Sequence, residues 1–180
     1  HSLDRRQRQM CIRDSGTLRS ELLAQAWPCG PRVADLGCGA GFLTSTLAAR
    51  SASVIGVDHS ERMLQQARAN AEGAEFRRGE LDALPLADGE VDAAFANLVW
   101  HHVPDYDTAA REVYRVISPG GVAVVSDLSP HESEWMRERM GDLRLGVKAE
   151  DVAASLARAG FRDLQTAGVA DRYRVQSPAG

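Results

Sequence analysis

The sequence predicts an α/β domain with a doubly wound, mostly parallel sheet, and three observations lead to this prediction. Short runs that are almost wholly apolar recur along the chain, as expected of parallel strands covered by helices on both faces. These runs alternate with segments whose apolar residues recur at helical spacing. A glycine-rich loop joins the first run directly to the following helix, in VADLGCGAGFLT at 33–44.

Five strands are expected, in this order along the chain: 32–37, 52–58, 74–80, 91–100 and 121–128. Helices are expected at 16–27, 42–51, 60–71, 106–117 and 148–161, with Ser60 as an N-cap and Gly160 as a stop. Residues 161–178 have the pattern of two more strands, of which we expect the last to be incomplete. Because no spacer or composition shift divides the chain, we interpret 16–180 as one domain.

Composition and charge narrow the class of protein. The chain has 180 residues, is 44% apolar, and carries a net charge of -4, which argues against nucleic acid or an anionic membrane as the main partner. The longest apolar runs, such as VAVV at 122–125, are too short to span a bilayer. The three cysteines show no CxxC spacing, which favours free thiols in a reducing compartment. We therefore expect a soluble, cytoplasmic protein that acts on a small molecule.

The first fifteen residues do not continue into the fold pattern. RRQRQMCIRDS at 5–15 contains five charges and no periodicity that extends into the following helix. It resembles a peptide produced when sequencing-adapter DNA is translated by mistake. We therefore exclude 1–15 from fold reasoning as artefactual, the alternative being a native, basic, disordered tail.

The glycine loop between the first strand and its helix indicates a binding site for a ligand. Gly37, Gly39 and Gly41 stand at alternate positions, and Asp35 precedes the first of them by two residues. A dinucleotide fingerprint has its third glycine one position later, and a phosphate-binding P-loop needs a lysine that this loop lacks. The loop lies at the carboxyl end of a parallel strand, where α/β proteins bind their ligands.

Two carboxylates near this loop indicate the charge and shape of the ligand. Asp35 would repel a pyrophosphate but suits an ammonium group, or a water molecule held near one. Asp58 ends the second strand, where an acid accepts hydrogen bonds from both ribose hydroxyls of an adenosine. A cationic adenosine derivative with these properties is S-adenosylmethionine.

Four stretches resemble, in order, the successive motifs of class I S-adenosylmethionine-dependent methyltransferases: VADLGCGAGFLT, VIGVDHSERML, GELDALPLADGEVDAAFANLVWHHVPD and VYRVISPGGVAVVSDL. The resemblance spans about residues 20–128 and implies a Rossmann-like sheet of seven strands with an antiparallel last strand. The segment 126–147 is similar to a branch found fused behind repressors of the arsenical-resistance type. Arsenite methyltransferases bind arsenic through several cysteines. This chain has Cys11, Cys29 and Cys38, which are too few and wrongly placed, so we do not infer an arsenic substrate.

The resemblance also implies roles for individual residues toward the cofactor. The methionine side is expected to be lined by Asp35, Gly37, Cys38, Gly39 and Gly41, with Cys38 as a small packing residue rather than a nucleophile. The ribose and adenine are expected to contact Asp58, His59, Met63, Glu80 and Leu81, although the family has aspartate where this chain has Glu80. Asn97 is expected to face the sulfonium.

Methyl transfer is an in-line displacement, so holding the reactants in position supplies most of the acceleration. A base is needed only where the acceptor must lose a proton. The candidate bases are His102, which we favour, His101 and His131, with Asp127 as an orienting partner. The alternative is that WHH at 100–102 closes a strand and packs, with Trp100 in the core. No ligand set with metal-binding spacing stands out, so we expect no metal.

Three questions stay open at this point. Trp135, Met136 and Met140 share one helical stripe within 131–142, which predicts either core packing or a mobile lid over the acceptor. An NAD-dependent oxidoreductase shares the sheet and the ribose-binding acid, but it would need a different glycine spacing. A regulatory module that binds the cofactor without catalysis is the stronger rival, because the pattern indicates a cofactor pocket better than it indicates an acceptor.

Overall fold

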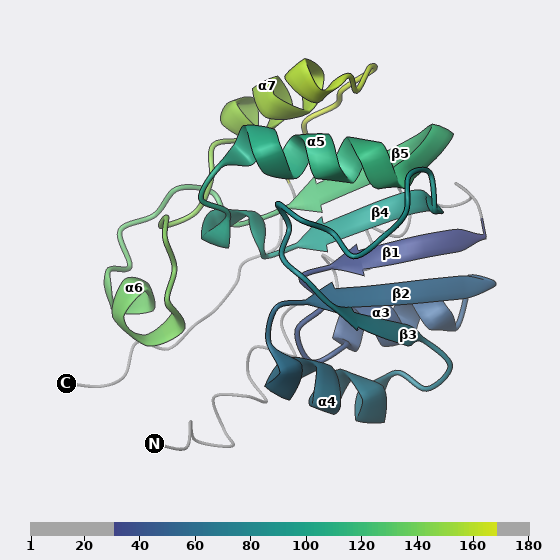
Figure 1. Cartoon of the computed structure of the whole chain (residues 1–180). Coiled ribbons are helices and arrows are strands. Elements are labelled where there is room, and N and C mark those ends of the chain that lie inside the picture. The colour runs from purple at the N-terminus through teal and green to yellow at the C-terminus, as the bar shows by residue number, and fades with distance from the viewer. Residues whose placement is uncertain (1–30, 169–180) are drawn as a thin grey trace.

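The computed structural model describes residues 31–168, and in this part of the chain the sheet has five parallel strands. They are β1 (Arg32–Leu36), β2 (Ser53–Asp58), β3 (Glu75–Arg78), β4 (Val91–Asn97) and β5 (Ile117–Ser126). Their order in the sheet is β3-β2-β1-β4-β5, and all their carboxyl ends point toward one edge (Figure 1). The chain therefore reverses its direction of winding between β1 and β4, which is where doubly wound sheets bind ligands.

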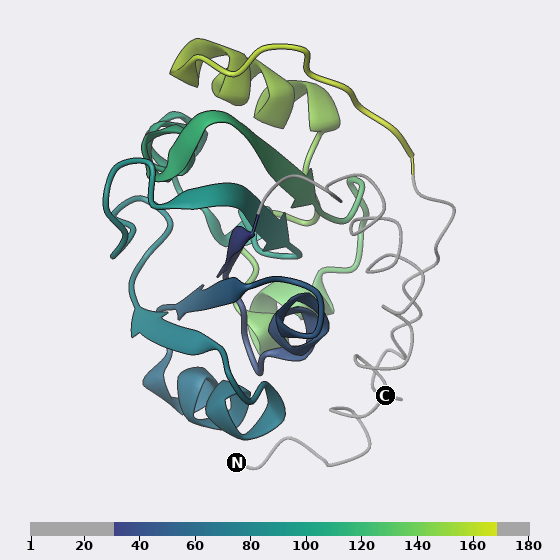
Figure 2. The same ribbon diagram turned by 90° about the vertical axis from the view of Figure 1, so that its right-hand side faces the viewer.

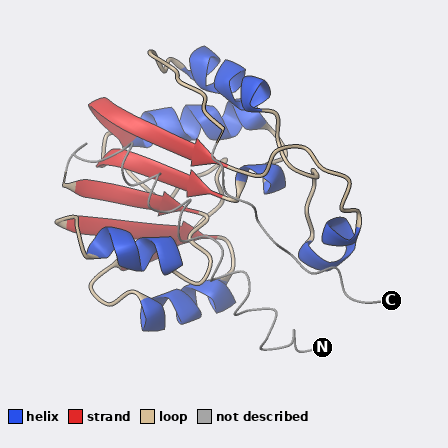
Figure 3. Cartoon of the chain, turned by 180° about the vertical axis from the view of Figure 1, so that it is seen from behind, coloured by secondary structure: helices blue, strands red, loops and turns tan. Residues whose placement is uncertain are grey.

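Helices cover both faces of this sheet. They are α3 (Phe42–Ala48), α4 (Glu61–Asn70), α5 (Tyr106–Val116), α6 (Trp135–Met140) and α7 (Ala149–Ala159), with a 3-10 helix, η1, at Trp100–His102. Helix α5 lies in front of the strands in Figure 1, and α3 lies in front of them in the view from behind in Figure 3. The sheet is visibly twisted when seen along its strands in Figure 2.

Neighbouring strand residues face the two different helical layers. Val33 of β1 packs in the cluster that contains Leu43 and Leu47 of α3, whereas Ala34 packs in the cluster that contains Val113 of α5. Both faces of a strand are therefore buried, because successive side chains point to opposite sides. This is why the strands stand out in the sequence as continuous apolar runs.

The helix ends follow the signals in the sequence. Ser60 precedes α4, and its Oγ accepts a hydrogen bond from the Met63 amide at 3.4 Å. Asp105 caps α5 by accepting from the Asp107 amide at 3.0 Å. Gly160 ends α7 in a left-handed conformation. These boundaries confirm the predicted helices at 60–71, 106–117 and 148–161 to within a few residues.

The last strand and the chain termini differ from the expectation. Strand β5 begins at Ile117 rather than at residue 121, because SPGG at 118–121 lies within it at a register shift opposite Val91 and Ala93. Residues 161–168, where the first of two further strands was expected, form no strand. The tail at 1–15, the expected helix at 16–27 and the second of the two further strands lie outside the described residues.

Helix α6 carries the stripe for which core packing and a mobile lid were the two alternatives. Met136 is buried, with 4% of its surface exposed, but Met140 on the same stripe is 43% exposed and Trp135 is half-buried. Of the six residues of α6, Met136 alone is buried. Within residues 31–168, no helix has the length and apolar character needed to cross a membrane.

We predict that Leu47→Ala lowers the free energy of unfolding by about 2–5 kcal/mol, because it opens a cavity in a fully packed layer. Leu47 is 1% exposed and joins α3 to the sheet. Leu143→Ala serves as the control, since Leu143 is 50% exposed and its loss should change stability by less than about 0.5 kcal/mol. Equal losses for the two variants in urea denaturation would contradict the described packing.

Candidate functional site

The glycine loop forms the tight connection between β1 and α3. Gly37, Gly39 and Gly41 all have positive φ, at 71°, 53° and 82°. The Gly37 and Cys38 amides both donate to the Val57 carbonyl, at 2.8 and 2.9 Å, which ties the loop to the end of β2. Residues with a Cβ adopt these left-handed conformations only with strain, so the alternating glycines follow from the path of the chain.

The three glycines serve different purposes. A Cβ on Gly37 would collide with the Val99 side chain, and one on Gly41 would approach the Ala67 Cα to 2.9 Å. A Cβ on Gly39 would meet no atom of the described residues within 4 Å. The outer glycines therefore allow close packing of the protein on itself. The middle glycine leaves its backbone open, which is the geometry of a cradle for a ligand.

Asp58 connects this cradle to the second strand. Its Oδ2 accepts a hydrogen bond from the Gly39 amide at 2.8 Å, and its Oδ1 accepts one from the Ser60 amide at 2.8 Å. The residue is 8% exposed. Because a carboxylate oxygen accepts more than one hydrogen bond, both oxygens keep capacity for hydroxyl donors from a ligand.

Asp35 is the second carboxylate beneath the loop, and it is 2% exposed. Thr44 of α3 donates to its Oδ2 at 2.6 Å. Burial raises the pKa of Asp35 to about 6, and the hydrogen bond from Thr44 opposes this shift. Burial and the two nearby aspartates also raise the pKa of the Cys38 thiol, so at pH 7 Cys38 is a neutral packing group rather than a nucleophile.

The residues expected beside ribose and adenine lie around the same edge of the sheet. His59 follows Asp58, with a side chain that is 70% exposed and Nδ1 at 3.6 Å from Asp58 Oδ1. Met63 in the first turn of α4 is half-buried. Glu80, after β3, is exposed, and Leu81 is half-buried against the core. Glu80 and Leu81 follow the carboxyl end of β3, the strand paired to β2, and so lie at the same edge as Asp58.

The end of β4 contains a strained residue that sequence reasoning missed. Leu98 has a φ of 54°, which is uncommon for a bulky side chain. Its amide donates to the Ser126 carbonyl at 2.9 Å, and the Ser126 hydroxyl donates to Asn97 Oδ1 at 2.7 Å. The ends of β4 and β5 are thereby joined, and Asn97 is fixed in orientation. Backbone strain of this kind gathers at functional sites.

Asp127, directly after β5, contacts His101 and not the favoured His102. Its Oδ1 lies 2.7 Å from His101 Nδ1, and its Oδ2 accepts from the His101 amide at 3.0 Å. Burial alone would lower the pKa of His101, but the hydrogen bond and charge of Asp127, with the charge of Asp142, outweigh it and raise the pKa. Burial and the neighbouring His101 lower the pKa of His102. Trp100 beside them is in the core, fully buried.

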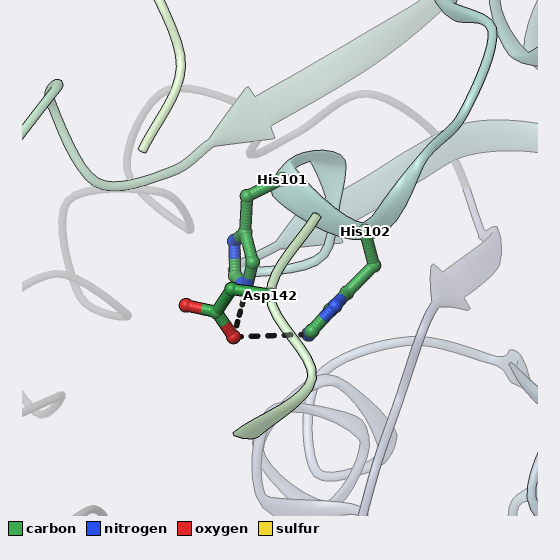
Figure 4. A group of neighbouring side chains, drawn as sticks. All are labelled: His101, His102 and Asp142. Atoms are coloured by element: carbon green, nitrogen blue, oxygen red, sulfur yellow. Dashed lines mark ion pairs between the residues drawn. The ribbon is translucent and has the colours of Figure 1, made fainter. Parts of the chain in front are cut away.

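A further carboxylate, Asp142, lies beside both histidines (Figure 4). Its Oδ1 is 3.7 Å from His101 Nε2 and 3.9 Å from His102 Nε2. The side chain is 1% exposed, and neither of its oxygens has a hydrogen-bond partner within residues 31–168. Nothing in the local sequence distinguishes Asp142 from a surface acid, because its partners are some forty residues away in the chain.

The third candidate histidine, His131, has different surroundings. Its Nδ1 accepts a hydrogen bond from the Ser133 amide at 3.2 Å, while its Nε2 is buried without a partner in the described part of the chain. It lines a cavity of about 370 Å³ between the end of β5 and α6, together with Leu128, Trp135 and Met136. No described hydrogen bond joins His131 to His101 or His102.

Comparison with known proteins gives the same result as the motifs. The model of a family described as "Methyltransferase domain" matches residues 34–125, more than half of the chain. The arsenite methyltransferase of Halobacterium salinarum is 34% identical over 152 residues, which cover 77% of this chain and 39% of that protein. The chain thus spans well under half the length of this relative.

Two solved structures extend the comparison to the fold. The S-adenosylmethionine-dependent methyltransferase of Mesorhizobium loti superposes with a TM-score of 0.71, at 27% identity and 83% coverage of each chain. The second structure is a chain from the complex of the Haloferax volcanii Trm112 methyltransferase activator with a methyltransferase. It superposes with a TM-score of 0.78 at 24% identity and covers 98% of this chain and 80% of that one. At this identity the likeness bears on the fold alone. Together with the glycine loop and its two aspartates, these matches show that the chain belongs to the class I S-adenosylmethionine-dependent methyltransferases.

Proposed function

We propose that this protein transfers a methyl group from S-adenosylmethionine to a small-molecule acceptor. One observation carries the proposal: an open glycine backbone at Gly39 is held against Asp58, above the buried Asp35, at the carboxyl edge of a parallel sheet. The glycine loop at 37–41 presents backbone beside two carboxylates and contains no basic residue. The arrangement suits a cationic adenosine ligand and disfavours a pyrophosphate.

The residues present fit the cofactor. We assign the methionine side to Asp35, Gly37, Cys38, Gly39 and Gly41, the ribose to Asp58, the adenine to His59, Met63, Glu80 and Leu81, and the sulfonium side to Asn97. When bound, S-adenosylmethionine supplies a methyl carbon already activated by the positive sulfur. The protein's task is then to orient the cofactor and the acceptor, a contribution of about 7–11 kcal/mol in well-oriented reactions.

The acceptor side is proposed to lie beyond the ends of β4 and β5. The His102 side chain is 40% exposed, whereas that of the neighbouring His101 is 6% exposed. The lowered pKa of His102 keeps a nitrogen lone pair available at neutral pH. We assign His102 the role of accepting a proton from a hydroxyl or ammonium acceptor. Asp127 acts as a positioning residue through His101, and His131 contributes to the cavity beneath α6.

The acceptor itself is proposed only as a small molecule. The name of the Halobacterium relative makes arsenite one candidate. Cys38 is the one cysteine within the described residues, and it is buried with a raised pKa, so it is poorly suited to bind arsenic as a thiolate. We therefore favour an acceptor recognised through oxygen or nitrogen. We also assign to α6, whose Met136 is buried, the role of covering the acceptor.

We further propose that residues 16–180 form one domain that works in the cytoplasm. The packing of α7 on α5 supports the domain, because Val152 and Leu156 of α7 belong to the same core cluster as Val113. The cytoplasmic location rests on the cysteine spacing alone.

The cofactor cradle predicts that Gly39→Ala weakens binding of S-adenosylhomocysteine at least about tenfold, or 1.4 kcal/mol, because the new Cβ fills the open space. The matched control is Gly73→Ala. Gly73 has a φ of 83° and equally open surroundings, but it lies in the turn between α4 and β3, at the other end of the strands. Both variants should lose about 1–2 kcal/mol of stability to backbone strain.

Isothermal titration calorimetry of the three proteins separates these effects. The proposal holds if the Gly73 variant binds like the wild type while the Gly39 variant does not. It is contradicted if the two variants bind equally well, since the open backbone would then have no ligand above it.

Burial of Asp35 predicts a specific pH dependence of folding. Its pKa of about 6 lies above the unfolded value of 3.8, so the folded chain holds the proton more tightly and stability falls as pH rises between these values. The loss attributable to Asp35 is about 3 kcal/mol. The free energy of unfolding of wild type minus that of Asp35→Asn should therefore decrease from pH 4 to pH 6.5. A difference that stays constant in urea titrations would refute the raised pKa.

The activity is tested by incubating the protein with methyl-labelled S-adenosylmethionine and a panel of hydroxyl, amine, thiol and arsenite acceptors. Label should move to an acceptor and S-adenosylhomocysteine should form in equal amount. Tight cofactor binding without transfer to any acceptor would instead support a regulatory module. Binding of NAD in place of S-adenosylhomocysteine would support an oxidoreductase.

A further inference from the structure

Three side chains form a compact group beside the proposed transfer path, which we call the histidine–aspartate cluster: His101, His102 and Asp142. One ligand atom from each lies within 4.8 Å of the others. The two rings are neighbours on η1, with centroids 4.1 Å apart, and Asp142 approaches both Nε2 atoms from the segment after α6 (Figure 4). Two imidazoles and one carboxylate are a common ligand set for first-row transition metals.

The state of Asp142 points to a missing partner. The Asp142 side chain is 1% exposed, and neither of its carboxylate oxygens has a hydrogen bond to any described residue. A buried carboxylate without a partner opposes folding. The two histidine nitrogens that face it are 3.7 and 3.9 Å away, too far for hydrogen bonds. The carboxylate is therefore aimed at a position between the rings rather than bonded to either.

The surroundings of His101 match those of a metal ligand. Asp127 occupies Nδ1 at 2.7 Å, so a neutral ring directs its Nε2 lone pair toward Asp142. Asp127 is itself fixed, because its oxygens also accept hydrogen bonds from the His101 and Leu128 amides. A carboxylate that orients the far side of a histidine is the usual support for a metal-bound imidazole. His59 also has a carboxylate beside its Nδ1, but Asp58 Oδ1 is 3.6 Å away, beyond hydrogen-bond distance.

The segment that carries Asp142 is attached to the histidines. The Arg144 amide donates to the His101 carbonyl at 3.2 Å, and its guanidinium donates to the carbonyls of Val103 and Pro104. Gly141, with a φ of 76°, turns the chain directly before Asp142. Asp142 is thus held beside η1 by bonds that do not involve its own side chain, which is what a preorganised ligand requires.

We propose that the histidine–aspartate cluster binds one divalent transition-metal cation of the zinc class through His101 Nε2, His102 Nε2 and Asp142. The ligand set favours this class over Mg²⁺ or Ca²⁺, which prefer oxygen alone. Ligand atoms on a tetrahedral zinc lie about 3.3 Å apart, given bonds of 2.0–2.1 Å. The two separations from Asp142, 3.7 and 3.9 Å, need a contraction of less than 1 Å. The separation between the two histidine nitrogens is within 4.8 Å and needs at most about 1.5 Å, which rotation of the exposed His102 side chain can supply.

The site would be open on one side, because the His102 side chain is 40% exposed. Three protein ligands leave a fourth position for water or another small ligand, as in metal sites that take part in reactions. If the proposed methyl transfer is correct, this position would face the acceptor, and a bound cation would lower the pKa of an acceptor hydroxyl. In that state His102 Nε2 is occupied by the metal, and its role as a base belongs only to the metal-free protein.

The test measures binding of Zn²⁺ and Co²⁺ alone, without cofactor, to the untagged chain after treatment with a chelator. Calorimetry and metal analysis after dialysis should find one equivalent of Zn²⁺. Co²⁺ should give the intense visible absorption of a tetrahedral site. His102→Gln and Asp142→Asn should each abolish the stoichiometric binding, and Asp127→Asn should weaken it by about 10–100-fold. His59→Gln is the control, since this exposed histidine is outside the cluster and should leave binding unchanged.

The result is independent of the proposed function, because no cofactor or acceptor is present. Absence of stoichiometric binding by folded wild-type protein would overturn the metal site, as would equal binding by the His102 and control variants. Because Asp142 is buried, the Asp142→Asn variant is interpreted only if its circular dichroism spectrum matches that of the wild type. If the spectra differ, the His102→Gln variant still tests the proposal, since this side chain is partly exposed. A failure to bind S-adenosylhomocysteine in a separate titration would overturn the methyltransferase proposal alone.

Discussion

The hydrogen bond from the Gly39 amide to Asp58 is the interaction on which the rest of the site depends. It joins the loop after β1 to the end of β2 at 2.8 Å, and the adjacent Gly37 and Cys38 amides reinforce it by donating to Val57. Only a loop with left-handed residues can turn sharply enough to make these bonds and still enter α3 at once. The same bonds place an open stretch of backbone next to a carboxylate, which defines the proposed cofactor cradle.

Buried charge gathers at this edge of the sheet. Asp35, Asp58, His101 and Asp142 are the buried aspartates and the buried histidine of the described chain, and each lies at or beside the carboxyl end of a strand. Such burial opposes folding unless partners or ligands compensate. Arginine pairs elsewhere, such as Arg77 with Glu90, are far more exposed. The distribution indicates that the carboxyl edge is arranged for ligands, while the two apolar layers supply the stability.

The sheet could be predicted from the sequence because its strands are buried on both faces and therefore stand out as apolar runs. Strand β4 was expected at 91–100 and ends earlier, at Asn97, where Leu98 adopts a left-handed conformation that no local pattern signals. The start of β5 was missed because SPGG at 118–121 has the composition of a loop, although it continues the pairing across a register shift. Local propensity gives way to tertiary pairing in both cases.

The candidate site was predictable where it is built from contiguous motifs and not where distant segments meet. Gly39 and Asp58 were identified because a loop and a strand end are visible in the sequence. The pairing of Asp127 with His101 instead of His102 depends on which way each ring leaves η1, and adjacent histidines are indistinguishable in the sequence. Asp142 joins them only because Arg144 ties its segment to η1. The expectation of no metal was formed without this residue.

The central claim concerns a ligand above the Gly39 backbone, and an amide NMR spectrum of nitrogen-labelled protein tests it most directly. On addition of S-adenosylhomocysteine, the account predicts that the Gly39 amide signal and those of its loop neighbours shift, while Gly73, in the turn between α4 and β3, does not. Unchanged loop signals in a well-dispersed spectrum at saturating ligand would contradict it.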